Sequence, residues 1–192
     1  MNIYDKMNRI NKTEIYENGD KYIGEFKNNL RDGNGIMYFN KNVEKNIIRY
    51  EGEWKNGIRE GKGKLYGNNG NIYEGDFKNG KGEGKGIYYY NNGNRYEGDF
   101  KNGLKEGKGI FCYNNGDKYE GDFKNDKYEG KGFFCYKNGD RYEGDFKNGI
   151  REGKGIIYYN NGEREMGDYL NNKPIGKQLK FMVDKKISIK NY

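Results

Sequence analysis

The chain contains no histidine, one serine (Ser188) and two cysteines, and these shortages exclude most kinds of catalysis. Histidine is the commonest general base and metal ligand in proteins. Without it a lone serine cannot form a Ser-His-Asp triad, and two cysteines alone cannot hold a structural zinc ion. We therefore expect no catalytic residue, no metal site and no cofactor.

Proline and long hydrophobic runs are also scarce. Pro174 is the only proline, so no proline-rich linker divides the chain, and hydrophobic residues make up only 32% of its 192 residues. No segment approaches the ~18 apolar residues of a transmembrane helix, and the N-terminus lacks the apolar core of a signal peptide. These features predict a cytoplasmic protein with neither a transmembrane segment nor a signal peptide.

The two cysteines, Cys112 and Cys135, are 23 residues apart and occupy the same position of a repeat. If each repeat is a hairpin, they lie two strands apart, or about 9–10 Å at the usual strand spacing. A disulfide needs Cα atoms within about 7 Å. We therefore expect free thiols and a reducing compartment.

Glycine and aromatic residues are abundant instead, and they recur every 23 residues. The run Tyr73 to Lys78 (Tyr-Glu-Gly-Asp-Phe-Lys) returns at residues 96, 119 and 142. Gly24 precedes Gly52 by 28 residues, so five residues are inserted, which we place between residues 41 and 49. A strict period of this length indicates a repeat architecture, which suits binding better than chemistry.

Each repeat has the pattern of two strands. Tyr73, Gly75 and Phe77 alternate with charged residues, as in a half-buried strand. A Gly-rich segment, residues 81–86, which we interpret as a flexible loop, leads into a second run rich in β-formers. The turn at residues 91–94 contains Asn-Gly, which favours tight hairpins. The sequence predicts an all-β, single-layer, elongated antiparallel meander of stacked β-hairpins.

The repeats define three regions. Residues 1–21 are expected to form an N-terminal cap with a partial repeat, and residues 22–164 contain six full repeats. Residues 165–192 form a degenerate seventh repeat with a C-terminal cap, in which Gln178 replaces a consensus glycine. Terminal repeats usually depart from consensus because they cap the stack.

The run Tyr50 to Gly57 (Tyr-Glu-Gly-Glu-Trp-Lys-Asn-Gly), followed by Gly-Lys-Gly at residues 61–63, resembles the MORN (membrane occupation and recognition nexus) repeat. The resemblance extends from about residue 14 to residue 183 and repeats six times in register. It implies a sheet of stacked hairpins acting as a scaffold in cortical cytoskeleton, cilia or membrane junctions. Phosphoinositide binding has also been proposed for this repeat.

The first candidate site is an aromatic groove that would hold a helical or extended segment of a partner protein. Its motivation is a periodic apolar surface that carries no chemically reactive groups. The expected groove residues are Tyr50, Trp54, Tyr73, Phe77, Tyr96, Phe100, Tyr119, Phe123, Tyr142 and Phe146.

The second candidate site is the opposite face of the second strands, where small polar residues of the family pattern are replaced by apolar ones. A single sheet cannot bury both of its faces, and large exposed apolar patches usually mark interfaces. A partner, the C-terminal tail or a second copy in a homodimer would cover this face; alternatively, tyrosine hydroxyls make it tolerable to water. Its residues are Ile87, Tyr89, Ile110, Cys112, Phe133, Cys135, Ile156 and Tyr158.

The third candidate site is basic. The net charge is +7, and one lysine recurs in each Gly-Lys-Gly segment, where several copies could hold an anionic membrane surface by avidity. A solvated edge is the alternative, and interleaved acidic residues argue against nucleic acid. The lipid-binding candidates are Lys62, Lys85, Lys108, Lys131 and Lys154.

We therefore predict a non-enzymatic scaffold or adaptor that binds a partner protein along the aromatic groove, in a cytoskeleton-, cilium- or membrane-associated assembly. The alternative is a peripheral module that binds phosphoinositides or other anionic lipids through its basic residues.

Overall fold

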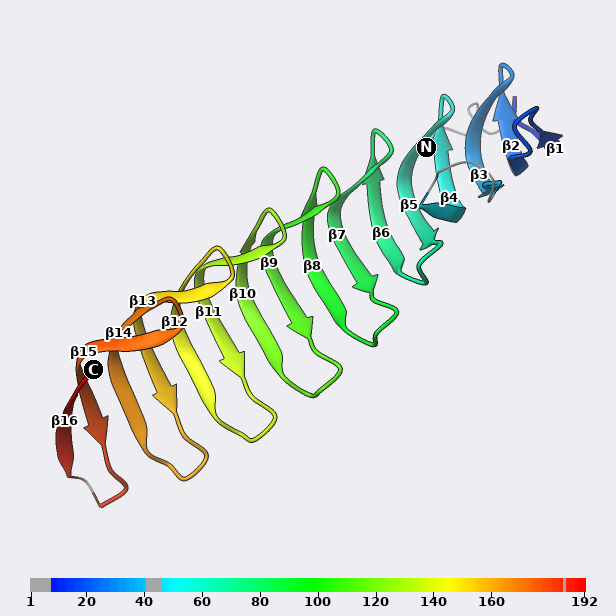
Figure 1. Ribbon diagram of the computed structural model, residues 1–192. Coiled ribbons are helices and arrows are strands. Elements are labelled where there is room, and N and C mark those ends of the chain that lie inside the picture. Colours follow the sequence, from blue (N-terminus) through cyan, green and yellow to red (C-terminus); the bar gives the residue numbers. More distant parts are fainter. Residues whose placement is uncertain (1–7, 41–45, 185) are drawn as a thin grey trace. The chain divides into compact units, whose positions relative to one another are not determined.

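The computed structural model describes residues 8–40, 46–184 and 186–192. Sixteen antiparallel strands follow one another in chain order in one open sheet, and the described residues contain no helix (Figure 1). This confirms the predicted all-β meander. The strands are β1 (Ile10–Ile15), β2 (Lys21–Lys27), β3 (Leu30–Tyr38), β4 (Ile47–Lys55), β5 (Ile58–Gly67), β6 (Ile72–Lys78), β7 (Lys81–Tyr89), β8 (Arg95–Lys101), β9 (Leu104–Cys112), β10 (Lys118–Lys124), β11 (Lys127–Cys135), β12 (Arg141–Lys147), β13 (Ile150–Tyr158), β14 (Arg164–Leu170), β15 (Lys173–Phe181) and β16 (Ile187–Asn191).

The chain forms two compact units. Unit 1 comprises Met1–Asn92 and Phe100–Gly103, and unit 2 comprises Gly93–Asp99 and Leu104–Tyr192. The division into three regions that the sequence predicts stays a proposal. Its boundaries follow the 23-residue period and do not coincide with those of the two units. Part of the predicted cap, residues 1–7, and most of the predicted insert, residues 41–45, lie outside the described residues.

The Gly-rich segment of each repeat is a strand, which corrects the prediction of a flexible loop. Lys81–Tyr89 forms β7, and the chain reverses at the two-residue turn Asn79-Gly80, where both residues have positive φ (50° and 79°). Gly75 pairs with Gly86, while Asp76 pairs with Glu83, so two residues bulge out of β7. Gly84 and Lys85 form this bulge, and the pairing of β6 with β7 continues on either side of it.

The core lies on the face that carries the tyrosine and phenylalanine of each repeat, which we call the inner face. The Tyr50 ring lies over Gly63, where an added Cβ would meet the hydroxyl oxygen at 2.4 Å. The Tyr50 hydroxyl donates to the carbonyl of Glu53 at 3.0 Å. Its ring packs edge-to-face against Trp54 and Phe77, with centroids 5.1 and 5.0 Å away. Each glycine therefore makes room for one ring, and each ring bridges adjacent repeats.

Carboxylates join each repeat to the next along the edge formed by the two-residue turns. Glu83 accepts a hydrogen bond from the backbone N–H of Asn102 at 3.0 Å, and Glu106 accepts one from Asn125 at the same distance. These amides belong to turn residues with positive φ, and the strand ladder leaves them without a partner. The bond therefore satisfies the turn and fixes its position.

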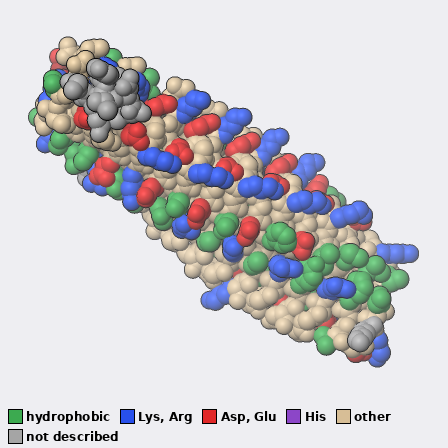
Figure 2. All heavy atoms as spheres, turned by 180° about the vertical axis from the view of Figure 1, so that it is seen from behind, with side chains coloured by type: hydrophobic (Ala, Val, Ile, Leu, Met, Phe, Trp, Pro, Cys, Tyr) green, Lys and Arg blue, Asp and Glu red, His purple; other side chains and the backbone are tan. Residues whose placement is uncertain are grey.

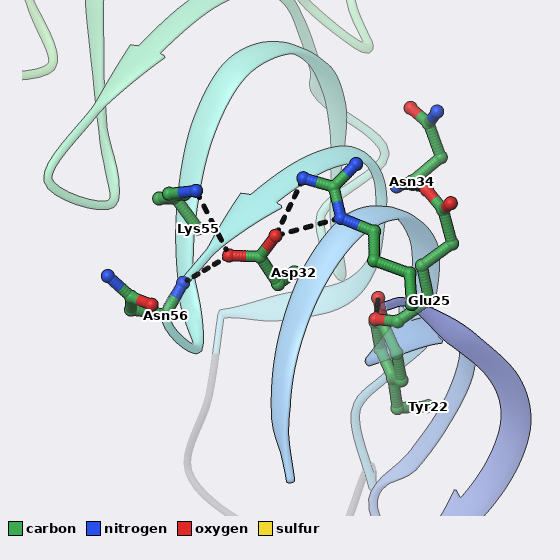
Figure 3. Close-up of polar contacts among 7 residues, drawn as sticks. Tyr22, Glu25, Asp32, Asn34, Lys55 and Asn56 are labelled. Carbon is green, nitrogen blue, oxygen red and sulfur yellow. Dashed lines mark hydrogen bonds and ion pairs between the residues drawn. The ribbon is translucent and has the colours of Figure 1, made fainter. Parts of the chain in front are cut away.

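The first repeat has a buried variant of this contact. Asp32 stands in the glutamate position, and its side chain is only 1% exposed. Lys55 and the Asn56 amide converge on it (Figure 3), and Arg9 donates through Nε and Nη2 at 2.9 and 2.6 Å. Burial alone would raise the pKa of Asp32, but these donors outweigh it and hold that pKa below its usual value. Arg9 therefore ties β3 to the segment before β1.

Candidate partner-binding cleft

The ten predicted groove residues lie in the core of the protein, which corrects their assignment as a docking surface. Their exposed fractions range from 0% for Tyr96 to 6% for Phe100. Alternation along a strand identified their shared face correctly. It did not show that each tyrosine ring would lie against a glycine of the neighbouring strand, or that all ten side chains would be buried.

In several repeats the side chain at one variable position covers a tyrosine ring, although that position is Gly82 in the third repeat. Arg59 lies 5.6 Å from the centroid of the Tyr50 ring, and burial lowers the pKa of this arginine. The Tyr128 ring stacks on Tyr119 with centroids 3.6 Å apart. Arginine or tyrosine at this position therefore seals a ring by cation–π or stacking contact. With at most 6% of each residue exposed, the ten predicted groove residues offer little surface to a partner.

The opposite, outer face carries the second set of predicted residues, and charged residues interrupt it. Register in unit 2 places Glu120 between Ile110 and Phe133, and Glu143 between Phe133 and Ile156. Each glutamate is paired within its own strand, and the hydrogen bond to Glu120 raises the pKa of Lys118.

Of the eight residues predicted for this face, Phe133 is exposed, at 41%, and the other seven are half-buried. The predicted apolar surface is therefore broken into single side chains over these strands. Cys112 and Cys135 are half-buried and free, as expected, and both pair in register with Lys118.

The same row becomes continuously apolar over the last four strands. Met166 stands where the repeats that begin at residues 50 to 142 have glutamate, and it pairs with Ile156 on one side and Leu179 on the other. Leu179 in turn pairs with Ile189. Met166, Leu179 and Ile189 are 37%, 38% and 61% exposed. We call Ile156, Met166, Leu179 and Ile189 the apolar row.

A cleft of about 550 Å³ runs beside this row on the outer face. Its floor is the backbone of Gly132, Gly144, Gly155 and Gly167, which pair with one another in register. Three residues of the apolar row, Glu143 and Phe133 line one wall, and lysines with Asp168 line the other. Figure 2 shows hydrophobic side chains gathered over the last strands, next to a band of alternating basic and acidic side chains.

Two of the five lysines predicted to bind lipid, Lys131 and Lys154, line this wall, and the other three occupy the same position in earlier repeats. Lys108 and Lys131 form ion pairs with Asp122 and Asp145 at 2.6 and 2.5 Å, so their charge is balanced at the surface. The same holds for Lys62 with Asp76 and, more loosely, for Lys154 with Asp168. Lys85 occupies the equivalent position of β7. These lysines lie on strands rather than on loops.

The last lysine of this wall differs from the others. Register places Asn191 opposite Lys177, where the earlier repeats place aspartate. No ion pair of Lys177 exists within the described residues. The cleft therefore ends with a cation that no carboxylate of the described chain neutralises.

Unit 1 has a cleft at the equivalent position, of about 520 Å³ and floored by Gly52, Gly63 and Gly75. Its wall carries Glu51, Lys64 and Glu74 in place of apolar residues, and Lys64 pairs with Glu74 at 3.1 Å. The groove itself thus follows from the glycine positions. Its apolar wall distinguishes the cleft of unit 2 from this one.

Sequence reasoning missed Met166, Leu179, Ile189 and Lys177. A signal was present, since Met166 interrupts the glutamate column and Asn191 interrupts the aspartate column, but their adjacency requires the strand register. Nowhere in residues 8–40, 46–184 and 186–192 do three His, Cys, Asp or Glu side chains gather as a metal site would require. The same ranges hold no helix long and apolar enough to cross a membrane.

Comparison with known proteins identifies the family. The MORN repeat model matches residues 22–42, 50–72, 73–95, 96–118, 119–141 and 142–164, so the chain belongs to the MORN repeat family. No curated protein matches it.

Comparison with solved structures finds matches that extend over most of the chain at low identity. The SAS-4 (dCPAP) TCP domain of Drosophila melanogaster, solved with a proline-rich motif of Ana2 (dSTIL), is 14% identical, with a TM-score of 0.48 over 95% of this chain and 90% of that one. A mutant TCP10 domain of Danio rerio CPAP is 8% identical, with a TM-score of 0.36 over 94% and 93%. The G-box domain of the microcephaly protein CPAP is 11% identical, with a TM-score of 0.36 over 95% and 99%.

Proposed function

We propose that this chain is a non-enzymatic scaffold that binds a protein partner in the cleft at the end of unit 2. The observation that carries the proposal is the apolar row beside a groove, in which Met166, Leu179 and Ile189 are exposed and Ile156 is half-buried. Exposed apolar side chains scattered singly are ordinary, whereas a contiguous row in a concavity is typical of an interface. The family resemblance extends the proposal to a cortical, ciliary or membrane-associated assembly.

The test is site-specific photo-crosslinking. A photoreactive residue is placed at Met166, and in a matched protein at Lys64 in the charged cleft of unit 1, and both proteins are added to a lysate of the source cell. We expect a protein adduct of defined mass from position 166 alone, and its loss when unlabelled wild type competes but not when unlabelled Met166→Glu competes. Equal labelling from both positions would overturn the proposal.

The alternative, a peripheral lipid-binding module, has the exposed lysine side chains in its favour and the ion pairs to aspartate against it. Vesicles containing phosphoinositide test it by co-sedimentation with wild type and with Lys85, Lys108 and Lys131 all changed to Glu. Binding by wild type that is lost in the variant and in high salt would favour this alternative over the scaffold. A crosslink between two copies of the chain would favour a homodimer instead.

A further inference from the structure

We infer that the occupant of the cleft is an amphipathic α-helix that lies across strands β13 to β16, with an apolar stripe against the apolar row and a carboxylate beside Lys177. This inference rests on the proposed function, and it specifies the shape and charge of the partner segment. It is drawn from the spacing of the row and from the chemistry of the two walls.

The spacing of the anchors favours a helix. The four side chains of the row occupy one register position on successive strands, so they recur about every 4.8 Å, or about 14 Å in all. Residues on one face of a helix recur at i, i+3 or i+4, and i+7, with a pitch of about 5.4 Å. One face of an extended segment recurs only every ~6.7 Å. A helix therefore presents about one side chain to each strand, which an extended segment does not.

The two walls require an occupant with two different faces. One wall carries the apolar side chains and Glu143. The other wall, two residues or about 6.7 Å away along the same strands, carries Lys131, Lys154 and Lys177 with Asp168. The first two of these lysines are paired with aspartate, and only Lys177 has no acidic partner among the described residues. A helix lying in the cleft exposes its next face to this wall, so one Asp or Glu beside the stripe would meet Lys177.

The charge pattern also fixes where the acidic residue lies along the row. Lys177 lies on β15, next to Leu179 in the same strand, so the carboxylate belongs beside the third anchor of the row. An anchor on β13, where Lys154 already contacts Asp168, would give the acidic residue no free cation. A second copy of this chain does not supply such a partner from its described residues, because these contain no helix.

A peptide-display selection tests the inference. A library of random linear peptides about 15 residues long, enough for roughly four helical turns, is selected on the immobilised full chain and depleted on Met166→Glu. We expect the enriched sequences to have apolar residues at i, i+3 or i+4, and i+7, with Asp or Glu flanking the stripe. Enrichment of apolar residues at i and i+2 would overturn the helix while leaving the cleft as a binding site. No Met166-dependent enrichment at all would overturn the proposed function as well.

A charge exchange then tests Lys177. An enriched peptide, labelled with a fluorophore, is titrated by anisotropy against wild type and Lys177→Glu. We expect roughly tenfold weaker binding to the variant, and recovery of most of that loss when the acidic residue of the peptide is changed to Lys. Lys131→Glu is the matched control, since that lysine already has an acidic partner. An equal loss in both variants, or no recovery on exchange, would overturn the role of Lys177. Unchanged far-UV circular dichroism confirms that each variant is folded.

Discussion

Gln178 donates from Nε2 to the main-chain carbonyl of Asp168 at 3.0 Å, and so takes over a hydrogen bond that a tyrosine makes in the preceding repeat. There the hydroxyl of Tyr142 donates to the carbonyl of Asp145, 23 residues earlier. In the last repeat Glu165 replaces the tyrosine, and Gln178 replaces the glycine that the ring would cover. The two changes compensate each other, since the space left by the ring is filled by the amide.

The pair should be coupled in stability. Glu165→Tyr alone brings a ring onto the Gln178 side chain, and Gln178→Gly alone leaves a cavity and removes a buried hydrogen bond. We expect each to lower the free energy of unfolding by about 1–3 kcal/mol. The double variant restores the consensus and should recover most of the loss. Urea titrations of the four proteins measure the coupling, and strictly additive losses would contradict it.

Glycines under the rings should tolerate no side chain. A Cβ at Gly155 would lie 2.4 Å from the Tyr142 ring, so Gly155→Ala should cost about 3 kcal/mol or more in stability. Gly149 is the matched control, because its turn has positive φ but nothing lies within 4 Å of an added Cβ. Gly149→Ala should cost only about 1 kcal/mol, from backbone strain alone. Similar losses in thermal or urea unfolding would show that the ring can move aside.

The carboxylate at the turn edge should protect one amide of the next repeat. Glu106→Ala removes the acceptor for the Asn125 N–H, and we expect a loss of about 0.5–1.5 kcal/mol together with faster hydrogen exchange at that amide. Glu106→Gln keeps an acceptor, so its stability and its exchange rate at Asn125 should be closer to those of wild type. Exchange at Asn102, whose acceptor is Glu83, is the internal reference. Equal acceleration at both amides would indicate global destabilisation instead.

High pH should unfold the protein steeply. Burial raises the pKa of Tyr142 to about 12 and raises that of Tyr50 and Tyr119 as well. Their folded-state pKa values exceed the unfolded value of about 10, so the stability is complete below pH ~10 and is lost as the pH rises toward and through the folded values. Above pH ~10, each such tyrosine lowers the free energy of unfolding by up to about 1.4 kcal/mol per pH unit. Tyrosinate absorbance and circular dichroism should therefore change together; ionisation of most tyrosines before unfolding would contradict the prediction.

Low pH should act through Asp32. Its pKa is lowered in the folded state, so its contribution is present above the unfolded value, near 4, and is lost as the pH falls through the lower folded value. We expect Asp32→Asn to be less stable at neutral pH and to lose less on acidification. Circular dichroism followed from pH ~6 to ~2 measures both. If wild type and Asp32→Asn lost the same stability on acidification, the prediction for Asp32 would be wrong.

The 23-residue period and strict alternation were sufficient to predict an antiparallel meander, because both are local properties. The Gly-Lys-Gly segment was misread as a loop, since glycine content alone does not distinguish a bulged strand from flexible chain. The bulge in β7 becomes visible only when Gly75 is paired with Gly86.

The site could be predicted only in part. The columns of Ile156 and Phe133 were recognised as apolar, yet whether such residues form a surface depends on what the adjacent strand places between them. Glu143 separates this pair, whereas Met166 joins Ile156 to Leu179. Likewise, the side chains that cover some of the groove tyrosines, such as Arg59 and Tyr128, come from a position that is glycine in the third repeat (Gly82), so the sequence pattern does not reveal it.

The carboxylate contacts across the turn edge link residues 19 positions apart, and each joins one repeat only to the next. Such a chain has a natural unit of insertion and deletion, namely a whole repeat. Removing residues 119–141, for example, would leave every class of contact with a partner, whereas removing one residue would reverse the facing of a strand. The number of repeats can thus change during evolution by duplication or loss of gene segments, while the cleft stays with the last strands.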